Sequence, residues 1–201
     1  MLAFAAAVFF LIITPGPGVL STAGVGSGYG AKAGTRYVVG LFIGNTAVAL
    51  AVVSGVAAVF LANPAIRTAL LVASGCYLLY LAYKIAFAGA KVAFIEKAEP
   101  PGVVGGVALQ AINPKAYAVH TTLFSGFAFL PDNTGLEAVL KLAIMSAIWI
   151  PIHFAWLWAG ISLHRLDLSP QRQRMVNLFM AASMIVVVVL AAFAPGGLAD
   201  G

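Results

Sequence analysis

Thr14-Pro15-Gly16-Pro17-Gly18 interrupts an apolar segment over residues 2–29, and Asn113-Pro114-Lys115-Ala116 interrupts a second one over residues 102–130. Proline inside a helix removes one backbone hydrogen bond and clashes with the preceding turn. In lipid, the freed backbone groups need another partner, so such breaks occur where they are buried in protein or line a watery cavity. Two breaks at matching places in the halves of a membrane chain point to a transporter's binding site.

Composition places the chain in the membrane. Its 201 residues are 62% hydrophobic and only 8% charged, with a mean hydropathy of +1.03, whereas a soluble domain carries about 25% charged residues. The formal net charge of +5 would suggest nucleic acid in a soluble protein, but neither aromatic-basic interleaving nor zinc-ligand spacing supports that reading. The single cysteine, Cys76, excludes an intramolecular disulfide, and its apolar neighbours predict a buried side chain.

Six apolar runs are each long enough to cross a hydrocarbon core about 30 Å thick. The N-terminus lacks the basic stretch and cleavage site of a signal peptide, so we expect the first apolar run to stay in the mature protein as a transmembrane span. Residues 1–201 are interpreted as one transporter domain with a polar cytoplasmic connector at about 89–101. The predicted spans cover about residues 2–29, 37–61, 66–88, 102–130, 136–163 and 175–193.

The basic residues orient these spans. With six spans the loops alternate between two sides, and eight basic residues fall on one side against two on the other. Cytoplasmic loops of membrane proteins carry the excess of Lys and Arg, which predicts that both termini lie outside. The predicted cytoplasmic set is Lys32, Arg36, Lys84, Lys91, Lys97, Arg165, Arg172 and Arg174, and the outer side has Arg67 and Lys141 with Asp132, Glu137 and Asp200.

The two halves of the chain share a pattern. Ser27-Gly28 and Ser125-Gly126 follow the first and second proline breaks at similar intervals. Each half holds three spans, and an odd number makes any repeat inverted. The predicted fold is therefore an all-α integral membrane protein of six transmembrane helices in two inverted three-helix repeats, about 1–88 and 102–201. Its helices 1 and 4 are broken at Pro15/Pro17 and Pro114.

The Thr-Pro-Gly-Pro stretch, the glycine-rich run through Gly34, Gly40 and Gly44, and Asn-Pro-Lys-Ala together resemble the lysine exporter (LysE/RhtB) family of amino-acid efflux proteins. The resemblance covers nearly the whole chain. It implies an inner-membrane exporter of amino acids or related small metabolites, driven by an ion gradient. Family members often have Asn where this chain has Gly18, and an acidic residue where it has Asn45. The second difference removes an anchor for a substrate amino group or a proton, which leaves cargo and coupling open.

Counting residues from the span ends at 1.5 Å per residue puts Thr14, Asn45, Lys115 and His153 near one depth, about halfway through the core. A central binding site requires such a set. Lys115 would hold a substrate carboxylate, or alternatively cap carbonyls freed by Pro114 or reach toward water. The predicted substrate-binding residues are Thr14, Pro15, Gly16, Pro17, Gly18, Asn45, Asn113, Pro114 and Lys115.

The remaining polar groups each have two interpretations. A half-helix beginning after Pro17 presents free N–H groups suited to a carboxylate, or is only a packing kink. Asn113 either repairs the broken backbone or contacts substrate, and Asn45 either joins the site or links helices. His120 and His153 are the proton-coupling candidates, since histidine titrates near neutral pH, although packing roles are common for buried histidines.

We therefore predict a secondary transporter that exports amino acids or related metabolites, by proton antiport with alternating access. Alternatives are a small-solute or ion channel, an assembly factor, or a membrane-embedded enzyme, although no nucleophile–base spacing or Walker A motif is present. No enzyme activity, cofactor or metal is expected. The expected partners are a small-molecule substrate and membrane lipid, without nucleic acid. The Gly40-Gly44 spacing permits a homodimer, although packing within the chain is the favoured interpretation.

Overall fold

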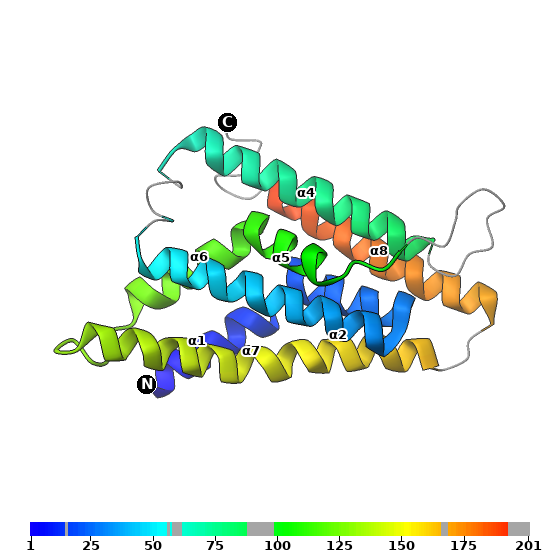
Figure 1. Cartoon of the computed structure of the whole chain (residues 1–201). Helices are drawn as coiled ribbons and strands as arrows, with labels where there is room; N and C mark the ends of the chain where they lie inside the picture. The colour runs from blue at the N-terminus through cyan, green and yellow to red at the C-terminus, as the bar shows by residue number, and fades with distance from the viewer. Residues whose placement is uncertain (15, 56, 58–61, 88–98, 166–168, 193–201) are drawn as a thin grey trace.

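A computed structural model describes residues 1–14, 16–55, 57, 62–87, 99–165 and 169–192, and these residues form α-helices and connecting turns without a strand (Figure 1). The helices form because the apolar stretches contain few residues that disfavour a helix. Prolines and glycines stand mainly where these stretches end. The helices are α1 (Leu2–Ile13), α2 (Pro17–Val53), α4 (Pro64–Ala86), α5 (Val103–Ile112), α6 (Pro114–Gly126), α7 (Thr134–Arg165) and α8 (Pro170–Ala192).

Length and composition mark several of these helices as membrane helices. Within the described residues, Pro17–Val53, Pro64–Tyr83 and Thr134–Ser162 are long and apolar enough to cross a bilayer, and Leu2–Ile13 and Val103–Ile112 are shorter apolar helices. Large apolar side chains also cover the outer faces of the bundle, as expected where lipid is the solvent. Examples with more than half of the side chain exposed are Leu2, Phe10, Val104, Trp158 and Phe179. The architecture is thus that of a helical membrane protein.

Two helix ends coincide with the Thr-Pro-Gly-Pro and Asn-Pro-Lys-Ala motifs. α1 ends at Ile13, Gly16 is extended, and α2 begins at Pro17. α5 ends at Ile112, Asn113 is extended, and α6 begins at Pro114. Proline suits the first position of a helix because its missing N–H would have no partner there. Pro15 lies outside the described residues.

α2 differs from the predicted pair of spans because helix continues through residues 31–36, where a connection was expected. The only non-helical residue inside α2 is Gly30, with φ 76° and ψ −169°, a conformation that favours glycine. Gly18 and Asn45 line the same cavity, although a straight helix between them would be about 40 Å long. α2 therefore folds back at Gly30, and its two arms lie beside one another.

The buried side chains form two clusters. The larger one joins α2, α4, α5, α8 and the later part of α7 through residues such as Tyr37, Leu81 and Leu157. The smaller one joins α1, α6 and the earlier part of α7 through Phe4, Val8, Leu123 and Met145. In Figure 1, α1 lies along α7 and α4 lies along α8. The molecule therefore has two packing units, and they do not coincide with the two sequence halves.

Glycines bring α2 and α5 into backbone contact. A side chain at Gly40 would overlap the main chain of Val103, and one at Gly44 would crowd Gln110 and the Val107 carbonyl. The Gly40-Gly44 face therefore packs within the chain, as the favoured interpretation held. Cys76 is exposed on α4, so the prediction of a buried thiol was wrong. Apolar neighbours in sequence do not distinguish a core from a lipid-facing surface.

Candidate functional site

Lys115 joins the two broken regions of the chain. Its Nζ donates to the carbonyl oxygen of Thr14 at 2.7 Å, although the two residues are 101 positions apart. Thr14 follows the last residue of α1 and so carries one of the carbonyls that a helix end leaves without an internal partner. The Lys115 ammonium therefore supplies a partner for backbone freed by the first break, whereas the capping role predicted for it concerned carbonyls freed by Pro114.

Asn113 fixes the start of α6. Its Oδ1 accepts from the Lys115 backbone N–H at 3.1 Å, which is an N-cap, and its Nδ2 donates to Gln110 Oε1 at 3.2 Å. Both amide side chains are almost fully buried. Asn113 therefore repairs the broken backbone, while Gln110 on the last turn of α5 holds the Asn113 amide in place.

Asn45 and His120 join α2 to α6. Asn45 Oδ1 and His120 Nε2 lie 3.1 Å apart, and because the amide oxygen accepts, Nε2 carries the hydrogen. Nδ1 of His120 is buried and has no hydrogen-bond partner among the described residues. This bond realises the interhelical role predicted for Asn45, and it also places both side chains on the wall of the cavity.

His153 is held against Trp149. Its Nδ1 donates to the Trp149 carbonyl at 3.0 Å, and the two rings stack with centroids 3.5 Å apart. Nε2 faces Gly18, where a Cβ would lie 3.3 Å from it and 3.5 Å from Gln110 Nε2. Gly18 thus leaves open the space between these two polar side chains.

These groups surround one cavity between the two packing units. Its volume is about 60 Å³, several times the roughly 10–15 Å³ that one water molecule needs. Among the described residues, Lys115 is the only charged one that lines the cavity, and none of these lining residues carries a carboxylate. The described lining residues are Leu11, Ile12, Thr14, Gly16, Gly18, Val19, Asn45, Gln110, Asn113, Lys115, Ala116, Val119, His120, Met145, Trp149 and His153.

Most of the predicted site residues therefore meet in this cavity. Pro17 and Pro114 start the helices beside it without lining it, and Pro15 is outside the described residues. The sequence argument missed Gln110, which lies one helical turn before Asn113. The signal available in the sequence was a glutamine within the apolar stretch just before the helix break. It also missed the aromatic wall at Trp149, because tryptophan in a span is equally typical of a lipid-facing position.

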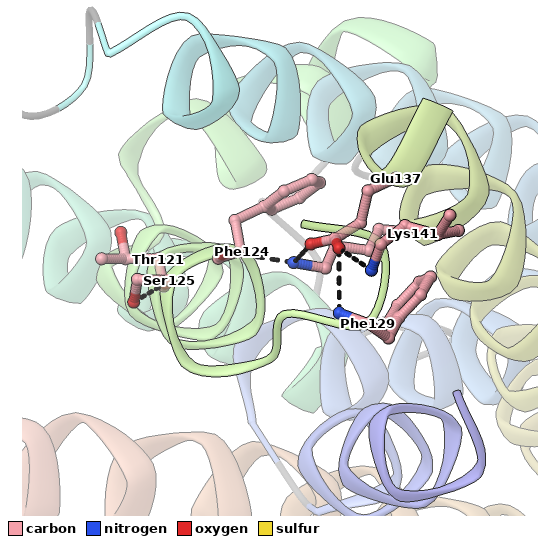
Figure 2. Close-up of polar contacts among 7 residues, drawn as sticks. Thr121, Phe124, Ser125, Phe129, Glu137 and Lys141 are labelled. Carbon is pink, nitrogen blue, oxygen red and sulfur yellow. Dashed lines mark hydrogen bonds and ion pairs between the residues drawn. The ribbon is translucent and has the colours of Figure 1, made fainter. Parts of the chain in front are cut away.

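A second polar cluster lies near the start of α7 (Figure 2). Lys141 Nζ and Glu137 Oε1 form an ion pair at 2.7 Å, and the Lys141 side chain is only 3% exposed. Both residues were predicted to belong to the outer side, which stays a prediction. Their mutual pairing, which the sequence does not show, allows both charges to be buried against protein.

Comparisons with known proteins agree with this architecture. The family model described as LysE type translocator matches residues 9–194. The chain belongs to that family. It is 27% identical over 146 residues to the leucine efflux protein of Enterobacter sp. strain 638, covering 70% of this chain and 69% of that protein.

A second relative covers more of the chain. The cysteine/O-acetylserine efflux protein of an Escherichia coli strain is 27% identical over 178 residues, which is 88% of this chain and 89% of that protein. No solved structure matches the chain. The family and these relatives support the role of an exporter of amino acids.

Proposed function

We propose that this chain is a secondary transporter that exports amino acids or related small metabolites across the bacterial inner membrane, by proton antiport with alternating access at the central cavity. The observation that carries the proposal is the Lys115–Thr14 hydrogen bond. It brings the two broken helices and their free backbone groups to one cavity, where interrupted helices of transporters bind their cargo.

Lys115 is the group proposed to bind a substrate carboxylate. A carboxylate entering the cavity would replace the Thr14 carbonyl as its partner, and a charged acceptor forms the stronger hydrogen bond. The N–H groups at the start of α2, next to Gly16 and Gly18, add a partial positive charge on the same side of the cavity. Together they favour a monoanionic group on the cargo.

The cargo's remaining parts follow from the rest of the wall. The amino group would contact uncharged acceptors such as Asn45 or Gln110, and the side chain would lie against Ile12, Val119 or Met145. The lining residues that the structure describes offer no carboxylate for a second positive charge. The cavity therefore favours amino acids with uncharged side chains, the class to which the leucine and cysteine named for the two relatives belong.

His120 and His153 are the proposed proton carriers. Nδ1 of His120 is the better placed atom, because it is buried beside the cavity and lacks a partner among the described residues. His153 Nε2 faces the open space left by Gly18. A proton arriving from outside would bind one of these nitrogens as the cargo leaves, which couples export to the proton gradient.

The overall membrane arrangement is part of the same proposal. We infer six spans in two inverted repeats, with both termini outside, from the span pattern and the asymmetry of the basic residues. Cysteines introduced one at a time at Ala3 and Lys32, in a Cys76→Ser background, would be labelled from opposite sides by a membrane-impermeant maleimide. Labelling of both from the same side would contradict this arrangement.

The experiment that tests the function is counterflow in liposomes holding the purified protein. Labelled leucine, cysteine, O-acetylserine, homoserine, lysine and glutamate form the panel, each with and without an imposed pH gradient. We expect saturable exchange of uncharged amino acids, no exchange of lysine, and stimulation by the gradient. Folded protein that exchanges none of the six would overturn the proposal.

Proton coupling has its own variants. His120→Gln and His153→Gln retain a hydrogen-bonding side chain of similar size but cannot bind a proton near neutral pH. One of them should exchange amino acids without responding to the pH gradient. If both variants keep the full response, neither histidine carries the proton.

A further inference from the structure

Glu137 and Lys141 connect more of the molecule than one turn of α7. Glu137 Oε2 accepts from the backbone N–H of Phe129 at 2.9 Å and from that of Leu130, both in the loop between α6 and α7. Lys141 Nζ donates to the Phe124 carbonyl in the last turn of α6 at 3.1 Å. Figure 2 shows these bonds converging on the ion pair. The pair therefore fastens the end of α6, the following loop and the start of α7 to one another.

The same lysine also contacts α1. Its Nζ lies 5.8 Å from the ring centre of Phe4 and 5.7 Å from those of Phe124 and Phe129, within the range of cation–π attraction. Phe4 itself packs edge-on against Phe127, with ring centres 5.8 Å apart. Lys141 is thus the common centre of the smaller packing unit, in which α1, α6 and the earlier part of α7 meet.

This unit joins the rest of the chain at prolines. Pro17 begins α2 just after α1, and Pro114 begins α6 just after α5. On α7 the change from the smaller to the larger cluster falls between Met145 and Trp149, and Pro151 lies inside the helix just beyond Trp149. The helix is broken just before Pro17 and Pro114, and Pro151 removes one backbone hydrogen bond inside α7, so we take these three positions as the joints between the units. The central cavity lies at the joints, and Lys115 and His120 face it from α6.

We propose that Glu137 and Lys141 are positioning residues for transport. The ion pair holds α6 in a fixed relation to α1 and α7, and so sets where Lys115 and His120 stand in the cavity at the other end of α6. The role in transport depends on the proposed function, whereas the mechanical link from the pair to the cavity does not. Neither residue touches the cavity itself, so their effect on it must pass along the helix.

A reporter at the cavity tests the link without any cargo. Ala116 lines the cavity, is 7% exposed, and follows Lys115 on α6. In a Cys76→Ser background, Ala116→Cys gives a single thiol at the cavity. Its rate of reaction with N-ethylmaleimide reports the accessibility of this position, and so the placement of α6. Lys141→Gln should change that rate by about tenfold, the ratio that a population shift of about 1.4 kcal/mol produces.

The controls separate positioning from general loss of stability. Lys141→Arg keeps the charge and should label at the rate of the parent protein, and Lys32→Gln removes an exposed lysine on α2 and should do the same. If Lys141→Gln does not fold in detergent, Glu137→Gln serves instead, because its amide oxygen still accepts from the loop N–H groups. Lower thermal stability with an unchanged labelling rate would overturn the proposal.

The outcome is separable from that of the transport assay. If the protein exchanges no amino acid but loss of the ion pair changes the labelling rate at Ala116→Cys, the mechanical link stands and the proposed function is wrong. If the protein transports amino acids but loss of the ion pair leaves the labelling rate unchanged, the function stands and the positioning role is wrong.

Discussion

His120 Nε2 and Asn45 Oδ1 lie 3.1 Å apart, and this bond crosses the cavity wall from α6 to the second arm of α2. Asn45 is uncharged, whereas the family resemblance implies an acidic residue at this position. The residue at position 45 therefore decides whether the Lys115 ammonium is the only charge on the cavity wall or is accompanied by a carboxylate, among the residues that the structure describes.

Asn45→Asp should widen the range of cargo toward cationic amino acids. The introduced carboxylate would balance the Lys115 charge and give a second ammonium on the cargo a partner. Lysine counterflow should rise from background to a measurable rate, while leucine exchange falls. Asn45→Ser, which shortens the side chain without adding charge, is the control. Lysine exchange that is equal in both variants would contradict the prediction.

Lys115→Met should weaken substrate binding while leaving the protein folded. A hydrogen bond to a charged group contributes about 1.5–3 kcal/mol, so KM for the transported amino acid should rise roughly 10- to 100-fold. Initial rates of counterflow over a range of concentrations measure this. Wild-type kinetics in the variant would show that Lys115 serves only to cap the Thr14 carbonyl.

Gly106→Ala should destabilise the contact between α5 and α2. The added Cβ would lie 2.5 Å from both the Tyr37 carbonyl oxygen and the Leu41 amide nitrogen, and backbone atoms cannot move aside as a side chain does. Overpacking of this kind costs about 1–3 kcal/mol. Thermal unfolding in detergent measures it against Gly126→Ala, where nothing lies within 4 Å of the new Cβ. Equal melting temperatures for the two variants would contradict the close packing.

Pro151→Ala should stiffen α7. Proline inside a helix costs about 3 kcal/mol, so alanine should raise the thermal stability by up to that amount. If the two packing units move about this point, the maximal rate of exchange should fall while KM changes little. Pro64→Ala is the control, since proline at the first position of α4 interrupts no helical hydrogen bond. If Pro151→Ala changes neither the melting temperature nor the maximal rate of exchange, Pro151 is not a joint between the two packing units.

Most of the predicted site residues line the cavity because their positions follow from local rules, although Gln110 and Trp149 were missed. Proline positions set the helix ends, and counting residues along the spans put Asn45, Lys115 and His153 at a common depth. The fold-back of α2 at Gly30 was only partly anticipated, since a turn was expected nearby but helix was not expected to resume at once. One glycine with positive φ suffices for that reversal, and glycine is too common in this chain to mark the position.

The ion pair of Glu137 and Lys141 could not be predicted from the sequence in the same way. Charged residues near the end of an apolar run are normally exposed, and the spacing of the two is common on helix surfaces. What buries them here is the arrangement of the Phe129 amide and the Phe124 carbonyl around them. Those partners come from the loop and from α6, so only the tertiary structure reveals them.

The bond from Lys115 to Thr14 has a consequence for the part of the proposed cycle in which no amino acid is carried. A proton antiporter returns its site to the cytoplasmic side with the proton bound but without cargo, and an unpaired Lys115 ammonium in a low-dielectric cavity would oppose that step. The Thr14 carbonyl oxygen, 2.7 Å from Nζ, takes the place of the cargo's carboxylate. The cargo-free carrier therefore keeps a partner for this ammonium while it brings the proton inward.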